Sequence, residues 1–307
     1  MLIDADRTGL TCFSYLAAAQ LLQVDEFPRT NYGTEVHDVQ PAVAADGVIV
    51  ATACSRLGVQ ARLACNPAGL DGAGRTLAEA LGSHGVECRT VAGVRTPSIV
   101  VVTDGSGNRV WLPFLPNVTA TLEQLDLDFI DGSAMVYVDC YELLARPALR
   151  VIRHGVRRGV RLFVNLGGSP IPEQLLSDAL PAGSIEVVQT NVAEPRLEDA
   201  STLAQSLRTA FGAHVAVITA GARGAVALSE AGLVHAPAYH VPVRHVHGAG
   251  AAVSAVLACG LLQGRDLSAV LRLACAAGSW RCEAVPNEAW PSFDELEAFA
   301  AQRPLLD

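Results

Sequence analysis

The chain has 307 residues, 50% hydrophobic and 17% charged, which is enough to bury the core of one large α/β domain or of two smaller ones. Its formal net charge is −9, and all 22 of its lysine-plus-arginine residues are arginines. The lack of lysine excludes Schiff-base lysine chemistry and a Walker-type phosphate loop. An acidic chain without basic clusters also argues against nucleic acid or an anionic membrane as its main partner.

The first third of the chain predicts a strand, a helix and a hairpin. "ARLACN" (61–66) is apolar and short, as expected of a strand, and "AGRTLAEALGSHG" (73–85) has the pattern of a helix that ends at glycine. Two strand-like runs then flank a glycine-rich turn in "TPSIVVVTDGSGNRVWLPF" (96–114), which is typical of a hairpin. We expect this hairpin to belong to a small β element apart from the main sheet.

The rest of the chain alternates short apolar strands with helices. Such alternation predicts a parallel sheet with helices on both faces, which is a doubly wound α/β fold. The predicted strands are "AMVYVDC" (134–140), "VRLFVNL" (160–166), "IEVVQTN" (185–191) and "VAVITAG" (215–221), and the predicted helices are 146–159, 171–180 and 198–212.

Three segments at strand ends predict a site for an anion. They are "TNVAEP" (190–195), "TAGARG" (219–224) and the turn that opens "HVHGAGAAV" (245–253). Ligands of open α/β sheets bind at the carboxyl ends of the strands. Consecutive backbone N–H groups and the N-terminus of a helix favour an anion there. The three segments together predict a phosphorylated ligand with its metal ion.

The order of these motifs resembles the ribokinase-like (PfkB) family of carbohydrate and nucleoside kinases over nearly the whole chain. "VDEFP" (24–28) resembles the first lid strand of the family, and 96–109 resembles its lid hairpin. "SRLGVQARLACNPAGLDGAG" (55–74) resembles the segment with the G-x-D-x-x-G motif, here Gly69, Asp71 and Gly74. "NVAE" matches N-x-x-E, "TAGARG" matches T-x-G-x-x-G, and "HGAGA" takes the place of T-G-A-G-D.

The resemblance implies a single ribokinase-like domain over 1–307, with lid segments at about 20–40 and 93–116. It also implies ATP or another nucleotide with Mg²⁺, held through water by Glu194, and a homodimer formed through the lid. The residues that it assigns to nucleotide or anion binding are Asn191, Glu194, Thr219, Gly221, Gly224, Gly248, Ala249, Gly250 and, beside the base ring, Cys275.

Most departures from the family pattern lie on the acceptor side. The catalytic base of the family is the Asp of G-A-G-D, and Ala251 stands in its place. The substrate-binding Asp of the family falls on Ala19, its paired glycines on Ala44 and Ala45, and its Asn on Ile49. The D-x-N-x-R stretch of the family corresponds to "VNLGGSP" (164–170) and is not intact. General-base catalysis contributes about 10²- to 10⁴-fold to a rate, and alanine accepts no proton.

Three interpretations follow from this contrast. The first is a sugar-kinase homologue that binds a nucleotide or phosphorylated compound but is catalytically impaired or repurposed. The second is an active kinase for an unusual acceptor, with His247 as a substitute base, because histidine titrates near neutral pH. The third is a non-catalytic oligomeric protein that pairs through the apolar strands of the lid hairpin.

The remaining polar candidates have simpler interpretations. His235, His240, His245 and His247 suggest a metal cluster only loosely, because no cysteine or second carboxylate completes one. Asp139 and Glu142 follow a strand end and either face the cleft or cap the next helix, and we favour capping. We expect the eight cysteines to be reduced thiols, mostly buried. Without a signal peptide or a membrane span, we expect a cytoplasmic protein.

Overall fold

The structure, a computed structural model, describes residues 7–105, 108–173, 180–285 and 288–306. Its main sheet has eight strands in the order β14-β13-β12-β11-β10-β9-β1-β4. The strands from β12 to β4 are parallel, while β13 and β14 are antiparallel. The bounds are β1 Leu10–Phe13, β4 Ala61–Ala64, β9 Met135–Asp139, β10 Arg161–Asn165, β11 Ile185–Asn191, β12 Ala213–Thr219, β13 Ala225–Ser229 and β14 Gly232–Ala236.

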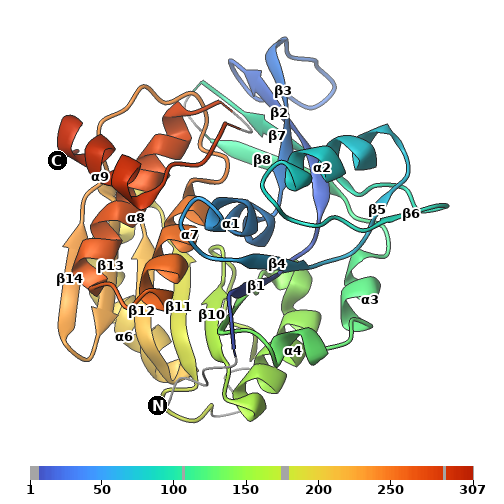
Figure 1. Ribbon diagram of the computed structural model, residues 1–307. Coiled ribbons are helices and arrows are strands. Elements are labelled where there is room, and N and C mark those ends of the chain that lie inside the picture. Colours follow the sequence, from blue (N-terminus) through green and yellow to red (C-terminus); the bar gives the residue numbers. More distant parts are fainter. Residues whose placement is uncertain (1–6, 106–107, 174–179, 286–287, 307) are drawn as a thin grey trace.

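Helices cover both faces of this sheet, which confirms the predicted doubly wound arrangement (Figure 1). On β9, Tyr137 packs into one core and Val138 into the other, because successive side chains of a strand point to opposite faces. The first core contains side chains of α1 Asp46–Cys54, α2 Gly72–Gly82, α7 Ala249–Leu262, α8 Leu267–Glu283 and α9 Phe293–Gln302. The second contains side chains of α3 Val118–Glu123, α4 Ala145–Arg158 and α6 Ala200–Phe211.

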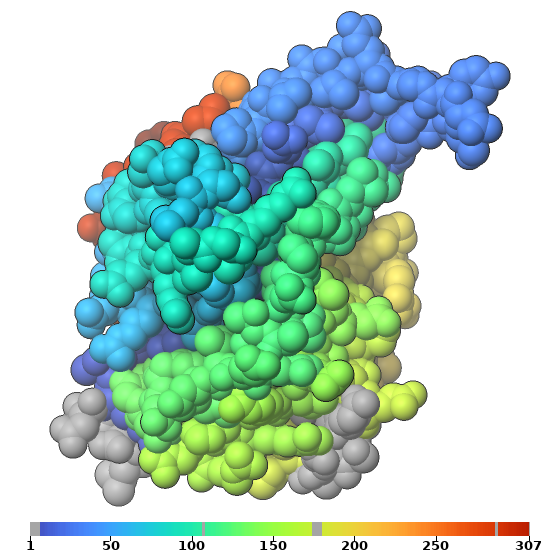
Figure 2. Space-filling view, turned by 90° about the vertical axis from the view of Figure 1, so that its right-hand side faces the viewer, coloured from blue at the N-terminus to red at the C-terminus, as the bar shows by residue number. Residues whose placement is uncertain are grey.

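A second sheet stands over one end of the main sheet, and we call it the lid sheet (Figures 1 and 2). Its strands are β3 Val36–Ala44, β2 Ala17–Val24, β7 Ser98–Thr103 and β8 Arg109–Phe114, in that order. β7 and β8 pair antiparallel, which confirms the predicted hairpin. β2 starts three residues before the proposed lid segment 20–40 and β3 ends four residues after it. Of "VDEFP", only Val24 belongs to a strand.

The other predicted elements agree with the structure to within a few residues. The predicted helix 73–85 is α2, and the strands 61–66, 134–140, 160–166, 185–191 and 215–221 are β4, β9, β10, β11 and β12. The predicted helix 171–180 lies mostly outside the described residues. Shorter elements are β5 Ala68–Gly69, β6 Thr90–Val91 and the 3-10 helices η1 Asp128–Ile130, η2 Glu142–Leu144, η3 Glu194–Asp199 and η4 Gly221–Arg223.

All eight cysteines lie in the described part of the chain and are free thiols, five of them buried, as predicted. Within the same residue ranges, no helix combines the length and apolar character that a membrane crossing requires.

Ala45 adopts a backbone conformation that glycine tolerates better. It precedes α1 with φ 88° and ψ 138°, a region that is strained for a residue with a Cβ. Sequence comparison places the second of two family glycines at this position. The positive φ of Ala45 is a conformation typical of glycine, which is consistent with that register.

We predict that Ala45→Gly stabilises the protein by about 1 kcal/mol, because relief of strain exceeds the entropic cost of glycine. Urea unfolding monitored by circular dichroism measures the change. Ala44→Gly is the matched control, because Ala44 is equally buried but lies in β3 without a positive φ. The control is expected to lose about 1 kcal/mol. Equal destabilisation by both variants would show that Ala45 is not strained.

Candidate active site

Polar side chains form a row where the parallel strands end, beneath the lid sheet. Asp139 is the last residue of β9 and pairs in register with Asn165, the last residue of β10. Asn165 in turn pairs with Gln189 of β11. All three side chains are buried although they are polar. Because burying a polar group without a partner is unfavourable, each one should be held by hydrogen bonds.

Asp139 is held by donors from two other elements. Its Oδ2 accepts from Ser14 Oγ at 2.5 Å and from the backbone N–H of Gly47 in α1 at 2.8 Å. Burial, and secondly the negative charge of Asp46, raise the pKa of Asp139 to about 7. The expectation that Asp139 caps the next helix is therefore wrong. Nor does any side chain cap η2, which begins at Glu142.

Asn165 joins the two carboxylates. Its amide Nδ2 donates to Tyr137 OH at 2.8 Å, to Asp46 Oδ2 at 3.1 Å and, more weakly, to Asp139 Oδ1 at 3.4 Å. Its Oδ1 accepts from the backbone of Gly167, the next turn. Asn165 lies in "VNLGGSP", which sequence comparison treated only as a lost motif. A polar residue at the end of an apolar strand is a pattern visible in the sequence, and it could have identified Asn165 as a site residue.

The row of polar residues reaches the glycine turn through α7. Ser254 Oγ donates to Gln189 Oε1 at 3.1 Å and also contacts the carbonyl oxygen of Gly250 at 3.0 Å. Gln189 Nε2 lies 3.5 Å from the same carbonyl oxygen. Because Asn165 and Gln189 are neighbours in register on β10 and β11, the acidic cluster lies beside the residues that contact the glycine turn.

The turn before α7 is the predicted anion site, and we call it the anion cradle. Gly248 precedes α7 with φ 78°, and a Cβ there would lie 2.9 Å from Ile49 Cδ1. Around Gly250, by contrast, the space for a Cβ is open. The N–H of Ala249 contacts the carbonyl oxygen of Val246 at 3.5 Å, whereas those of Gly250 and Ala251 have no acceptor within the helix, as is usual for a first helical turn. Ala251, in the same turn, is fully buried.

His247, the proposed substitute base, serves as a contact to the lid sheet. Its Nε2–H donates to the carbonyl oxygen of Val43 in β3 at 2.9 Å. Burial lowers its pKa, so the ring is neutral at physiological pH. His245 is also neutral, because burial, then Arg281 and then His247 lower its pKa to about 4.

A second contact joins the lid sheet to the same loop. Arg109 of β8 donates from Nη1 to the carbonyl oxygen of Val246 at 3.2 Å, and its guanidinium lies over the ring of Trp111. Burial lowers the pKa of Arg109, and the charge of Asp46 opposes this effect. Arg109 therefore brings a positive charge from the lid sheet towards the carboxylate of Asp46. Sequence reasoning identified neither Arg109 nor Asp46.

The other residues predicted to bind the nucleotide form a second group, at and after the ends of β11 and β12. Asn191 ends β11 and pairs in register with Thr219, the end of β12. Glu194 Oε1 accepts from the backbone N–H of Ala222 at 2.9 Å, and so holds the loop that contains Gly221. Asn191, Glu194 and Gly221 are solvent-exposed, as a site open to a soluble ligand requires.

Gly224 and Cys275 meet behind this loop. A Cβ at Gly224 would lie 2.1 Å from the carbonyl oxygen of Ala236, so only glycine fits there. Cys275 in α8 donates from Sγ to the same oxygen at 3.3 Å. Burial raises the pKa of Cys275 to about 12, so its thiol is protonated.

The side chains predicted to line the acceptor pocket are apolar and packed. Ala19 lies in β2 opposite Ala42 of β3 and contributes to a small core within the lid sheet. Ala44 belongs to the same core, while Ala45 and Ile49 pack into the core around α1. None of these four side chains offers a hydrogen bond to a sugar hydroxyl. The polar groups on this side come instead from Asp46 and its neighbours.

The fold and the arrangement of motifs agree with a family model described as "pfkB family carbohydrate kinase", which matches residues 10–286. The chain belongs to the pfkB family of carbohydrate kinases. No match is found among curated proteins.

Solved structures of pfkB-type kinases share the fold over almost the whole chain. Arabidopsis thaliana ribokinase complexed with ribose and ATP is 19% identical, with 96% of this chain and 99% of that chain covered and a TM-score of 0.73. Cryptococcus neoformans ribokinase in complex with ADP is 16% identical, with coverages of 95% and 99% and a TM-score of 0.76. Burkholderia thailandensis nucleoside kinase in complex with inosine is 16% identical, with both coverages 95% and a TM-score of 0.73. These likenesses show a ribokinase-like α/β fold.

We predict that Asp139 makes stability fall as pH rises. Its pKa is raised in the folded state from an ordinary value of 3.8 to about 7, so the folded protein holds a proton that the unfolded chain has released. The protonated form favours folding below about pH 4, and this contribution is lost as the pH rises towards about 7.

Urea unfolding of the wild type and of Asp139→Asn at a series of pH values from 4 to 8 measures this effect. The wild type should lose stability relative to the variant across this range, because asparagine does not titrate. A constant difference between the two proteins would contradict the raised pKa.

Proposed function

We propose that this pfkB-family protein binds a nucleotide and is impaired as a kinase for simple sugars. The observation that carries the proposal is Ala251, which is fully buried in the first turn of α7 where the resemblance places the catalytic base. His247 is a poor replacement, because burial lowers the pKa of its imidazole and its ring is held against the carbonyl oxygen of Val43. The anion cradle of backbone N–H groups remains in the same turn.

The acceptor side supports the same proposal. Ala19, Ala44 and Ile49 are each less than 5% exposed and contribute no polar group. A sugar hydroxyl buried without a partner costs about 1–3 kcal/mol, so several unpaired hydroxyls would weaken binding strongly. We infer that free sugars bind poorly, and that the protein has a regulatory function or acts on another acceptor.

The nucleotide is proposed to be ATP or a related compound with Mg²⁺. Two of the similar structures are complexes with ATP and with ADP. The described residues contain no group of three His, Cys, Asp or Glu side chains that could hold a metal ion. The exposed carboxylate of Glu194 would therefore hold Mg²⁺ through water, with phosphate oxygens as further ligands.

A homodimer through the lid sheet belongs to the same proposal. The side chains of Trp111, Leu112 and Phe114 in β8 are between 46% and 61% exposed, and Val39 of β3 is 55% exposed. Exposed apolar strands at the edges of a sheet favour pairing with another chain. A cytoplasmic location remains a prediction.

Calorimetric titration and kinase assays test the proposal together. We expect ADP or ATP to bind with a measurable heat, and phosphorylation of simple sugars to be undetectable. Ala251→Asp would raise any residual sugar turnover by about 10²- to 10⁴-fold if the base were the only missing group. We expect a smaller increase, because the acceptor pocket is also apolar. Ala251→Asn is the matched control, since it has nearly the same shape and accepts no proton.

Circular dichroism should show first that both variants fold. Robust phosphorylation of a simple sugar by the wild type, at tens of turnovers per second, would refute the proposed impairment. Failure of ATP, ADP and AMP to bind, with or without Mg²⁺, would refute nucleotide binding.

A second candidate function is phosphoryl transfer to an unusual acceptor, with a carboxylate at another position as base. The observation that favours it is Asp46, a partly exposed residue at the start of α1 whose Oδ2 is oriented by Asn165. The charge of Asp46 acts on both His247 and Arg109, so it lies close to the loop before the cradle. Positioning and electrostatics dominate phosphoryl-transfer catalysis, and a carboxylate here would add the general base.

Under this second candidate, Asp46→Asn should lower the turnover of the accepted substrate by about 10²-fold or more while nucleotide affinity stays unchanged. A survey of acceptors with ATP finds the substrate first, and calorimetry measures the affinity. Glu142→Gln is a suitable control, because it removes an exposed carboxylate that has no contact with Asn165 or Asp139. Unchanged turnover in Asp46→Asn would exclude Asp46 as the base.

A further inference from the structure

A small cavity lies close to Gly248, since Ile49 and Arg281 line it and are the side chains nearest to a Cβ at Gly248. Its volume is about 30 Å³, more than the roughly 10–15 Å³ that one water molecule needs. Its walls come from the lid sheet, from α1 and α2 and from the chain around the end of α8. The lining residues are Val43, Ile49, Thr52, Ala80, His84, Arg281, Glu288 and Trp290.

Arg281 is the buried charge in this cavity. The residue is only 5% exposed, and its guanidinium lies 5.5 Å from the centre of the Trp290 ring. Its Nε donates to the carbonyl oxygen of His247 at 3.2 Å. Among the described residues, no carboxylate lies within salt-bridge distance and no acceptor is hydrogen-bonded to either terminal nitrogen.

A buried guanidinium without a counter-charge is an unusual arrangement. Burial lowers the pKa of Arg281 to about 10, so it still carries its charge at neutral pH. Buried charges in proteins are generally paired, since the loss of hydration is costly. Arg281 lines the cavity, and the two terminal nitrogens of a guanidinium form the fork that binds the oxygens of a carboxylate or a phosphate.

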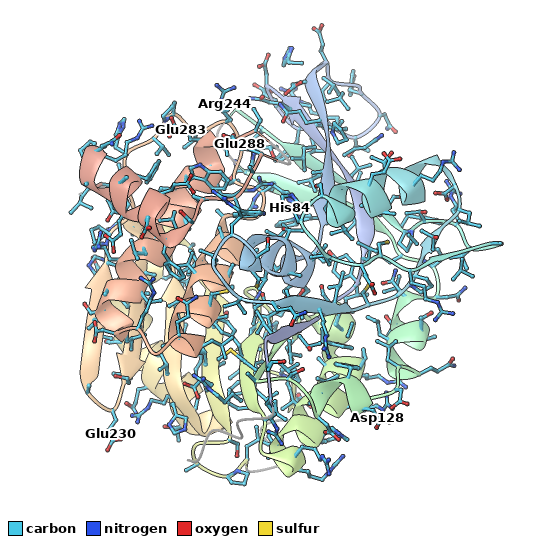
Figure 3. All side chains as sticks on the ribbon, viewed as in Figure 1. His84, Asp128, Glu230, Arg244, Glu283 and Glu288 are labelled. Carbon is cyan, nitrogen blue, oxygen red and sulfur yellow. The ribbon has the colours of Figure 1, made fainter. Side chains whose placement is uncertain are left out.

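The other titratable groups around the cavity do not replace such a ligand. Glu288 also lines it, but its residue is exposed and its Oε2 accepts from the backbone of Val285 at 3.0 Å. Burial lowers the pKa of His84, so its ring is neutral. Figure 3 shows His84 and Glu288 between the lid sheet and the C-terminal helices. One positive charge thus faces inward and one negative charge lies at the rim.

The cavity is coupled to the cradle by a single residue. His247 accepts from Arg281 through its carbonyl oxygen and donates through its side chain to Val43, another residue of the cavity wall. Gly248, the next residue, starts the turn of α7, and a Cβ there would lie 3.3 Å from Arg281 Nε. A ligand on Arg281 would therefore act on the position of the cradle.

We propose that this cavity binds one small oxyanion group, a phosphate, sulfate or carboxylate, on the terminal nitrogens of Arg281. The ion neutralises the buried guanidinium and fixes the loop that precedes the anion cradle. The site is separate from the cradle, and its existence does not depend on whether the protein binds nucleotide or transfers phosphate.

Calorimetric titration of the full chain with sodium phosphate, sulfate and acetate, at constant ionic strength set with chloride, tests the proposal. We expect saturable binding at millimolar concentrations, and Trp290 fluorescence should change with the same midpoint. Phosphate or sulfate binding without acetate binding would identify a tetrahedral oxyanion as the ligand, and acetate binding a carboxylate.

Variants on both sides of the turn locate the bound ion. Arg281→Gln should weaken binding at least about tenfold, the loss of one charge-assisted contact. Glu288→Gln, a change at an exposed position, should strengthen it because a repulsive charge is removed. Gly250→Glu places a negative charge at the cradle, in open space, and should leave this binding unchanged.

Ala80→Leu is a second variant, which tests the proposal even if Arg281→Gln does not fold. It fills the cavity from α2 and should also abolish binding while Arg281 stays in place. The proposal is overturned if the wild type shows no saturable binding. It is also overturned if Gly250→Glu abolishes binding while Ala80→Leu and Glu288→Gln leave it unchanged, because the ion is then held by the cradle.

Discussion

The site depends on one buried amide, that of Asn165. Its single side chain contacts a carboxylate of α1, a phenol of β9 and a second carboxylate at the end of β9. A buried network of this kind is favourable only when every member has a partner. The need to satisfy Asp139 therefore fixes the start of α1, where Gly47 donates its N–H, relative to the strand ends. Beside Asn165 in register, Gln189 of β11 and Ser254 of α7 form a second buried polar pair, which contacts the turn of α7.

The fold was predictable from sequence because it rests on periodic patterns. Apolar strands such as 185–191 are buried on both faces, and only a parallel sheet covered by helices accommodates several of them. The strand ends followed from the same reasoning, since parallel strands end at one edge. The motif order then identified the family, which no single glycine turn could have done.

The contents of the site were less predictable, because they depend on contacts between distant segments. Asp139 was assigned to helix capping, which is a local interaction, whereas its partners Ser14 and Gly47 are remote in sequence. Asp46 lies among Ala44, Ala45 and Ile49, where the family resemblance marks only missing polar groups. Its partner Asn165 is 119 residues away in the sequence. His247 was a reasonable base by type and position, but its hydrogen bond to Val43 spans more than two hundred residues. Such a contact has no signature in a single sequence.

The two halves of the proposed site would respond differently to substitution, because they would be built from different atoms. The proposed cradle uses backbone N–H groups, whose directions depend on Gly248 and on the packing of α7, so a change of side chain at 251 would leave them in place. The proposed acceptor half uses side chains, so a replacement by alanine or isoleucine would remove a hydrogen-bonding group outright. A carboxylate at position 251 would be fully buried, where its charge would be costly. Under the proposed impairment, packing alone would therefore favour alanine at 251, while the packing would not disfavour the cradle.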